Sequence, residues 1–243
     1  MTREYPPVYP CPRQEAKECG ELDLWRESHK ANISCARNIS GLIDTHTQDG
    51  QLKPDTAQFA LRNWGFRRVQ FVLANTLIGT GALDFEPESV RWARTAYVPP
   101  DKENPKFRIQ ADRPLLSQFL RQTYDVFLAQ GMFGPEHCGP SGQDYTGKVL
   151  VLRPDRLNES SLSVRNQLWL AESGFGLSPT SSGRAVFATC LGDGEKARWN
   201  RSDFMGPLDE QYLPDWAVEK LAELRNPSQE QTNGPSLGGM EMR

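Results

Sequence analysis

The sequence contains no long run of apolar residues. No stretch of its 243 residues approaches the roughly 20 consecutive apolar side chains that a membrane-spanning helix needs, so we expect no membrane partner. The first twelve residues, MTREYPPVYPCP, also lack the apolar centre of a secretory signal peptide. These two absences predict a cytoplasmic protein.

Cysteine and histidine are scarce, and their spacing matches no common metal site. The chain has five cysteines and three histidines, and it has no C-x-x-C pair. An odd number of scattered thiols in a reducing compartment argues against a disulfide framework. Only Glu136-His137-Cys138 brings three metal-capable side chains together, and adjacent residues rarely all ligate one ion. We expect no metal and no cofactor, and leave open whether His137 and Cys138 belong to any site.

A recognisable catalytic set is missing as well. Cys138 directly follows His137, and neighbouring side chains on an extended chain point apart, so the two do not readily form a nucleophile–base pair. Gly79-Thr-Gly81 lacks the lysine of a phosphate loop, and Gly192-Asp-Gly194 suits a hairpin tip. We therefore expect a protein that acts by binding and not an enzyme.

Neither sign of charge dominates the composition. The chain has 28 Lys and Arg against 31 Asp and Glu, which gives a formal net charge of -3. A general nucleic-acid binder is usually more basic than this, and a DNA mimic is more acidic. The balance favours a protein or a small molecule as partner and leaves nucleic acid possible. It indicates nothing about the oligomeric state.

Apolar residues recur at helical spacing through the first half of the chain. The spacing predicts a helix over 22–43 and a second one from Pro54 that ends at Gly65. Residues 66–77 fit both a helix and a strand, and their length favours a helix. Further helices are predicted over 86–96 and from Asp112, as the N-cap residue, to near 131.

Strand signals replace helical ones in the second half. Residues 148–153 and 166–171 are predicted strands, and 185–191 with 195–199 form a predicted hairpin. Pro214 opens a final helix. We expect an α+β fold, with a helical N-terminal domain followed by a small antiparallel β domain and a C-terminal helix. The expected division is an extended leader at 1–20, a helical domain at 21–135, a linker at 136–147, a β domain with terminal helix at 148–225 and a disordered tail at 226–243.

Two groups of cations are candidate contact sites. One is a possible positive face on the predicted helices, and the other surrounds Trp199 on an arm of the hairpin. Clusters of cations with an aromatic residue are common at protein interfaces and also bind RNA. The plain alternative is a solvated surface with one packed tryptophan. The predicted partner-binding residues are Arg67, Arg68, Arg91, Arg94, Lys196, Arg198, Trp199 and Arg201.

Several segments resemble a family of uncharacterised function that is carried on integrative and conjugative elements of Gram-positive gut bacteria. In the first half they are FRRVQFVLANTL, VRWARTAYVP and GMFGPEHC. In the second half they are VLVLRPDRL, NQLWLAESGFG and the run from SGRAVFATCLGDG to LPDWA. The resemblance covers most of residues 20–225. It implies mobile-element cargo, which often accompanies anti-restriction and DNA-transfer genes, and it implies no catalytic residues.

This context leads to two hypotheses of different classes. The first is a non-enzymatic inhibitor, anti-CRISPR-like, that binds a host defence nuclease or its ribonucleoprotein. The second is a nucleic-acid-associated accessory factor for conjugation or element maintenance, which rests on the two basic clusters. A third, a small-molecule enzyme, would need a deep pocket at His137 or Cys138.

Overall fold

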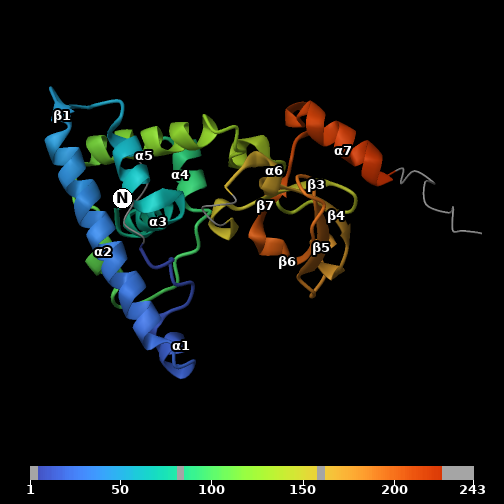
Figure 1. Cartoon of the computed structure of the whole chain (residues 1–243), viewed down its shortest axis with the longest axis horizontal. Helices are drawn as coiled ribbons and strands as arrows, with labels where there is room; N and C mark the ends of the chain where they lie inside the picture. The colour runs from blue at the N-terminus through green and yellow to red at the C-terminus, as the bar shows by residue number, and fades with distance from the viewer. Residues whose placement is uncertain (1–4, 81–84, 158–161, 226–243) are drawn as a thin grey trace, which may run out of the picture.

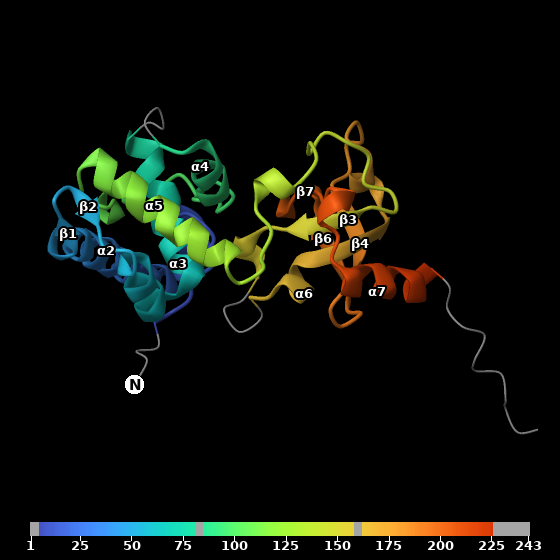
Figure 2. The same cartoon turned by 90° about the horizontal axis from the view of Figure 1, so that it is seen from above.

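The chain folds into a helical part and a sheet-containing part that lie side by side (Figures 1 and 2). The structure is a computed structural model and describes residues 5–80, 85–157 and 162–225. The helices occupy the first half of the chain, and the antiparallel sheet and the last helix occupy the second. The predicted α+β class is confirmed.

The helical part is built around three long helices, of which α3 packs against both α2 and α5. Its core contains Ile39, Val69 and Phe119, one from each of these helices. The elements of this part are α1 (Arg13–Glu18), α2 (Leu22–Thr45), β1 (Thr47–Gln48), β2 (Gln51–Leu52), α3 (Thr56–Thr80), α4 (Pro87–Ala93), η1 (Asn104–Phe107) and α5 (Arg113–Leu128).

Gly65 interrupts α3 as the sequence predicts. Its φ of 73° and ψ of 162° lie outside the helical region, so two helical segments meet there at a kink. Glycine has no Cβ and adopts positive φ with little strain, which makes it the natural residue at this point. The segment 66–77 is helical and is buried along nearly its whole length, as expected from its apolar content.

Two local predictions need correction. The leader is not extended throughout, because Arg13–Glu18 forms α1 with its buried side chain, Ala16, against the body. Asp112 occupies the N-cap position of α5, but its side chain makes no capping hydrogen bond. Pro114 in the first turn, whose fixed φ suits a helix start, marks the beginning of α5 instead.

The second half forms one five-stranded antiparallel sheet in the order β6-β5-β4-β3-β7. The sequence does not predict β7, because FMGP contains glycine and proline and has no alternating pattern. This strand lies at the sheet edge, where proline is tolerated. The elements are η2 (Pro135–His137), β3 (Val149–Leu152), η3 (Pro154–Arg156), α6 (Val164–Gln167), β4 (Leu168–Ser173), η5 (Phe175–Leu177), β5 (Ala185–Cys190), β6 (Lys196–Asn200), η6 (Arg201–Asp203), β7 (Phe204–Pro207), η7 (Glu210–Tyr212) and α7 (Asp215–Arg225).

The two faces of the sheet bury different cores. On one face Leu150 and Trp169 join an apolar cluster that continues without interruption into the helical part. On the other face Val149 and Leu168 pack against Leu221 of α7. The strand β3 is therefore buried on both faces, and α7 covers the opposite face of the sheet from the shared core.

The predicted linker and domain boundaries stay predictions, and the tail at 226–243 lies outside the described residues. Across the described ranges, every helix is too short or too polar to cross a membrane.

Candidate anion-binding cleft

A cleft of about 900 Å³ opens between the helical part and the sheet. Five arginines line it, and no aspartate or glutamate does so among the described residues. Other lining residues are neutral, such as Asn200 and Ser202. A chain with net negative charge thus concentrates cations in one cavity. The five arginines are Arg91, Arg94, Arg153, Arg184 and Arg201.

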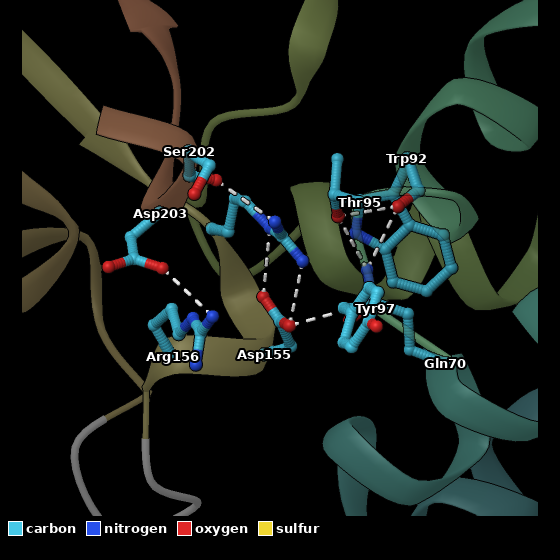
Figure 3. Close-up of polar contacts among 9 residues, drawn as sticks. Gln70, Trp92, Thr95, Tyr97, Asp155, Arg156, Ser202 and Asp203 are labelled. Carbon is cyan, nitrogen blue, oxygen red and sulfur yellow. Dashed lines mark hydrogen bonds and ion pairs between the residues drawn. The ribbon is translucent and has the colours of Figure 1, made fainter. Parts of the chain in front are cut away.

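The helical wall of the cleft is formed by α4 and the residues after it. Trp92 is completely buried in the core, which leaves Arg91 and Arg94, three residues apart, on the exposed side of the helix. The side chain of Gln70 in α3 fixes the end of α4 in place. Its Nε2 donates to the carbonyl oxygen of Trp92 and to Thr95 Oγ1, and both distances are 2.9 Å (Figure 3). The helix is therefore fixed with its arginines toward the cleft.

The opposite wall is organised by η6, which links β6 to β7. The backbone N–H of Arg201 donates to the carbonyl oxygen of Arg184 at a distance of 2.8 Å. The backbone N–H of Arg153 donates to the carbonyl oxygen of Asp203 at 2.9 Å. Asn200 caps η6 by accepting from the Ser202 N–H. These bonds place Arg153, Arg184 and Arg201, which are distant in the sequence, next to one short turn.

Arg201 is a buried cation without a carboxylate partner in the described ranges. Its Nη1 donates to the carbonyl oxygens of Gly176 (2.7 Å) and Leu177 (2.8 Å), and its Nη2 donates to those of Ser141 (2.6 Å) and Gln143. The guanidinium also lies 3.7 Å from the ring centroid of Tyr145. Arg201 therefore holds three loops together and leaves its positive charge at the cleft floor.

Arg153 is the one cleft arginine with an ion-pair partner among the described residues. Its Nε and Nη2 donate to the two oxygens of Asp155 over 3.1 and 2.9 Å, and its Nη1 donates to Ser202 O over 2.9 Å. Asp155 also accepts from the backbone N–H of Tyr97, over 3.3 Å, which links the sheet part to the helical part (Figure 3). This pair is mostly buried, with side-chain exposures of 15% and 14%.

The other three cations are available to a ligand. Arg91, Arg94 and Arg184 are exposed, and none of them forms an ion pair with any residue in the ranges that the structure describes. Arginine binds phosphate and carboxylate groups with a planar pair of N–H donors. The arrangement is suited to hold an anion with more than one negative group.

The predicted positive face of the helices is formed only in part. Arg91 and Arg94 line the cleft, whereas Arg67 is half-buried and lies outside it. Arg68 is 3% exposed and donates to the carbonyls of Ser28 and Pro6 and to the side chain of Asn32, so it is not a surface residue. Successive side chains on a helix point in different directions, so Arg68 faces the core although Arg67 does not. This corrects the prediction that Arg68 is a partner-binding surface residue.

The predicted cluster around Trp199 is divided between the two faces of β6. Side chains alternate along a strand, so Lys196 and Arg198 are exposed while Trp199 points to the shared core. There the Trp199 ring packs against Trp169, with centroids 5.2 Å apart. Of this predicted cluster only Arg201, which is buried, lines the cleft.

The sequence does not mark Arg153 and Arg184 as site residues. Arg153 is the last residue of one predicted strand and Arg184 directly precedes another, positions where a polar side chain is ordinary, and no local motif marks either residue. Their approach depends on the backbone bonds of η6, a turn that the sequence shows only as Asn200 and Asp203 three residues apart.

The side chains of His137 and Cys138 are both partly buried. Burial, followed by the negative charges of Glu136 and Asp209, raises the pKa of Cys138 to about 12, so its thiol stays protonated near neutral pH. The Nδ1 of His137 is 3.0 Å from the Gly134 N–H and 3.3 Å from Glu136 Oε1. Across the described ranges no three His, Cys, Asp or Glu side chains are grouped to hold a metal.

Comparison with known proteins relates only the helical part to a family. No curated protein and no solved structure matches the chain. The expected resemblance to a family of uncharacterised function is confirmed for part of the chain, whereas its mobile-element context stays a prediction. Residues 8–126, which run from the leader into α5 and include Arg91 and Arg94, match the family described as "Protein of unknown function (DUF3849)".

Proposed function

We propose that this protein binds single-stranded nucleic acid in the arginine-lined cleft, through the phosphate backbone. The observation that carries the proposal is the gathering of five arginines, with no lining carboxylate among the described residues, in a chain of net charge -3. Clefts lined by one sign of charge concentrate oppositely charged ligands. Arg91 and Arg94 come from the helical part and Arg184 from the sheet part, so a bound strand would contact both.

The shape of the site favours a single strand over a duplex. Proteins that read duplex DNA insert a helix or a ribbon into a groove, whereas this site is a concavity of about 900 Å³. The aromatic residues of its lining, Tyr145 and Phe204, are buried and offer no face for base stacking. We therefore expect binding with little base preference, dominated by charge.

The test is titration of a fluorescein-labelled 12-nucleotide single strand, DNA and RNA in separate arms, between 50 and 200 mM KCl. Three free arginines predict a slope of log K against log salt of about -2, from roughly 0.7 per phosphate contact, and a Kd of about 1–100 μM. Duplex DNA and inorganic pyrophosphate serve as competitors. Absence of any anisotropy change at 50 mM salt would refute the proposal.

A charge-matched pair of variants locates the binding. Arg94→Ala/Arg184→Ala removes two cleft cations, and Lys196→Ala/Arg198→Ala removes two exposed cations of β6 that do not line the cleft. We expect the first to weaken binding at least about 10-fold and to flatten the slope by about 1.4. The second should bind like the wild type. Equal losses in both variants would show that general charge, not the cleft, is responsible.

A second candidate is the predicted inhibitor of a defence ribonucleoprotein. The observation in its favour is Phe175, whose side chain is 77% exposed. Phe175 lies close to Arg184, because the backbone of the next residue, Gly176, packs directly against the Arg184 carbonyl oxygen. Large exposed aromatic residues serve as anchors at protein interfaces. Such a complex offers RNA for the cleft and protein for Phe175.

Co-expression should protect a targeted plasmid, and Phe175→Ala should abolish protection without changing oligonucleotide binding. Lack of protection across the CRISPR and restriction systems of the host would refute it.

A further inference from the structure

We propose that Asp155 sets the affinity of the cleft by occupying Arg153 as an internal substitute for a ligand phosphate. The inference rests on the proposed function. Arg153 lines the cleft and Asp155 does not. The carboxylate takes the Nε and Nη2 donors of the guanidinium in a bidentate pair, at 3.1 and 2.9 Å. This is the geometry in which arginine binds a phosphate group.

The carboxylate is held in place from both parts of the molecule. The backbone N–H of Tyr97, which follows α4, donates to its Oδ2, while Arg153 is fixed on its other side by the Ser202 carbonyl. Three of the five guanidinium N–H donors are therefore used within the described residues, and two remain. Arg153 stays at the cleft surface with its charge already balanced.

Removing the charge of Asp155 should have two effects of opposite sign. The buried Arg153 loses its counter-charge, so the free protein becomes less stable. The same unbalanced cation becomes available to a phosphate, so single-stranded nucleic acid binds more tightly. A side chain with a purely structural role would lower both stability and affinity. The combination of lower stability and tighter binding is thus specific to the inference.

The experiment compares the full-length wild type, Asp155→Asn and Asp125→Asn. Asparagine keeps the shape of the side chain and one oxygen for the Tyr97 N–H. Asp125 of α5 pairs with Arg121 at 3.4 Å, and neither residue lines the cleft, so its variant removes one carboxylate charge elsewhere and is the matched control. With the labelled 12-nucleotide DNA, Asp155→Asn should bind about 3- to 10-fold more tightly, with a salt slope steeper by about 0.7. Asp155→Asn should unfold at a lower urea concentration, whereas Asp125→Asn, which removes one partner of an exposed ion pair, should unfold like the wild type.

The inference is overturned if Asp155→Asn binds no better than the wild type, or if Asp125→Asn gains as much. If the wild type binds and Asp155→Asn shows no gain, only the inference falls. If neither binds at 50 mM KCl, the proposed function falls and the inference with it.

A second pair of variants keeps the test decisive if Asp155→Asn does not fold. Arg153→Gln leaves the carboxylate unbalanced beside the cleft and should weaken binding about 3- to 10-fold. The double variant Arg153→Gln/Asp155→Asn is neutral at both positions and should bind within about 2-fold of the wild type, because the paired arginine contributes little. Equal weakening in the single and double variants would contradict the inference.

Discussion

At the scale of the residue, Arg201 shows how one side chain organises the cleft floor. It satisfies four backbone carbonyl oxygens and stacks on Tyr145. We predict that Arg201→Met lowers the free energy of unfolding by at least about 2 kcal/mol, because these carbonyls lose a charged donor. Urea denaturation is the measurement. Arg198→Ala, an exposed substitution on β6, should change it by no more than about 0.5 kcal/mol. Equal stability of the two variants would contradict the assigned role.

The thiols provide a second prediction at this scale. The folded pKa of Cys138 is raised from 9.0 to about 12, mainly by burial, so its thiol is almost entirely protonated at pH 8. Alkylation by iodoacetamide, followed by peptide mass spectrometry, should modify exposed Cys19 rapidly and the partly buried Cys138 much more slowly, with the difference lost in urea. Because the folded pKa is the higher one, the contribution of Cys138 to stability is complete below about pH 9. It is lost as the pH rises toward 12. Equal labelling rates of Cys138 and Cys19 in the native protein would contradict the raised pKa of Cys138.

At the scale of the element, two glycines in long helices should respond in opposite ways to the same change. Gly65 has a φ of 73°, so Gly65→Ala should destabilise the protein by about 1–2 kcal/mol. Gly41 lies on the exposed face of α2 with nothing within 4 Å of an added Cβ. Gly41→Ala should stabilise it by about 0.5–1 kcal/mol. Thermal unfolding of both variants checks the pair, and a shift of the same sign in both would be inconsistent with the kink.

Elements with a strong local signal could be predicted from the sequence. The kink at Gly65 and the hairpin of β5 and β6 depend on residues close in the chain, and both are found where expected. The edge strand β7 could not be predicted, because its pairing with β3 creates it and FMGP has little strand preference of its own. The same reason applies to the cleft, whose Arg153 and Arg184 meet only through the backbone of η6.

At the scale of the whole molecule, the continuous apolar cluster bears on the predicted division into domains. It joins Phe127 of α5 to Leu152 of β3 and Phe204 of β7. We predict that α3, α5 and the central strands open together, because separating them would expose this shared core. Native-state hydrogen exchange should give the slowest amides of α5 and of β4 unfolding free energies within about 1 kcal/mol of each other. A clearly lower value for either element would show that the two parts unfold independently.

The edge strand β6 has a further consequence for behaviour in concentrated solution. Its partner on one side is β5, and the described residues pair with it on no other side, so its outer backbone groups could recruit a strand from a second molecule. The opposite sheet edge is shielded, since Gly139 donates to the carbonyl oxygen of Pro207 in β7. Lys196 and Arg198 stand on the exposed face of β6. Because cations on an edge strand disfavour pairing with a second copy of that strand, we expect Lys196 and Arg198 to oppose edge-to-edge aggregation.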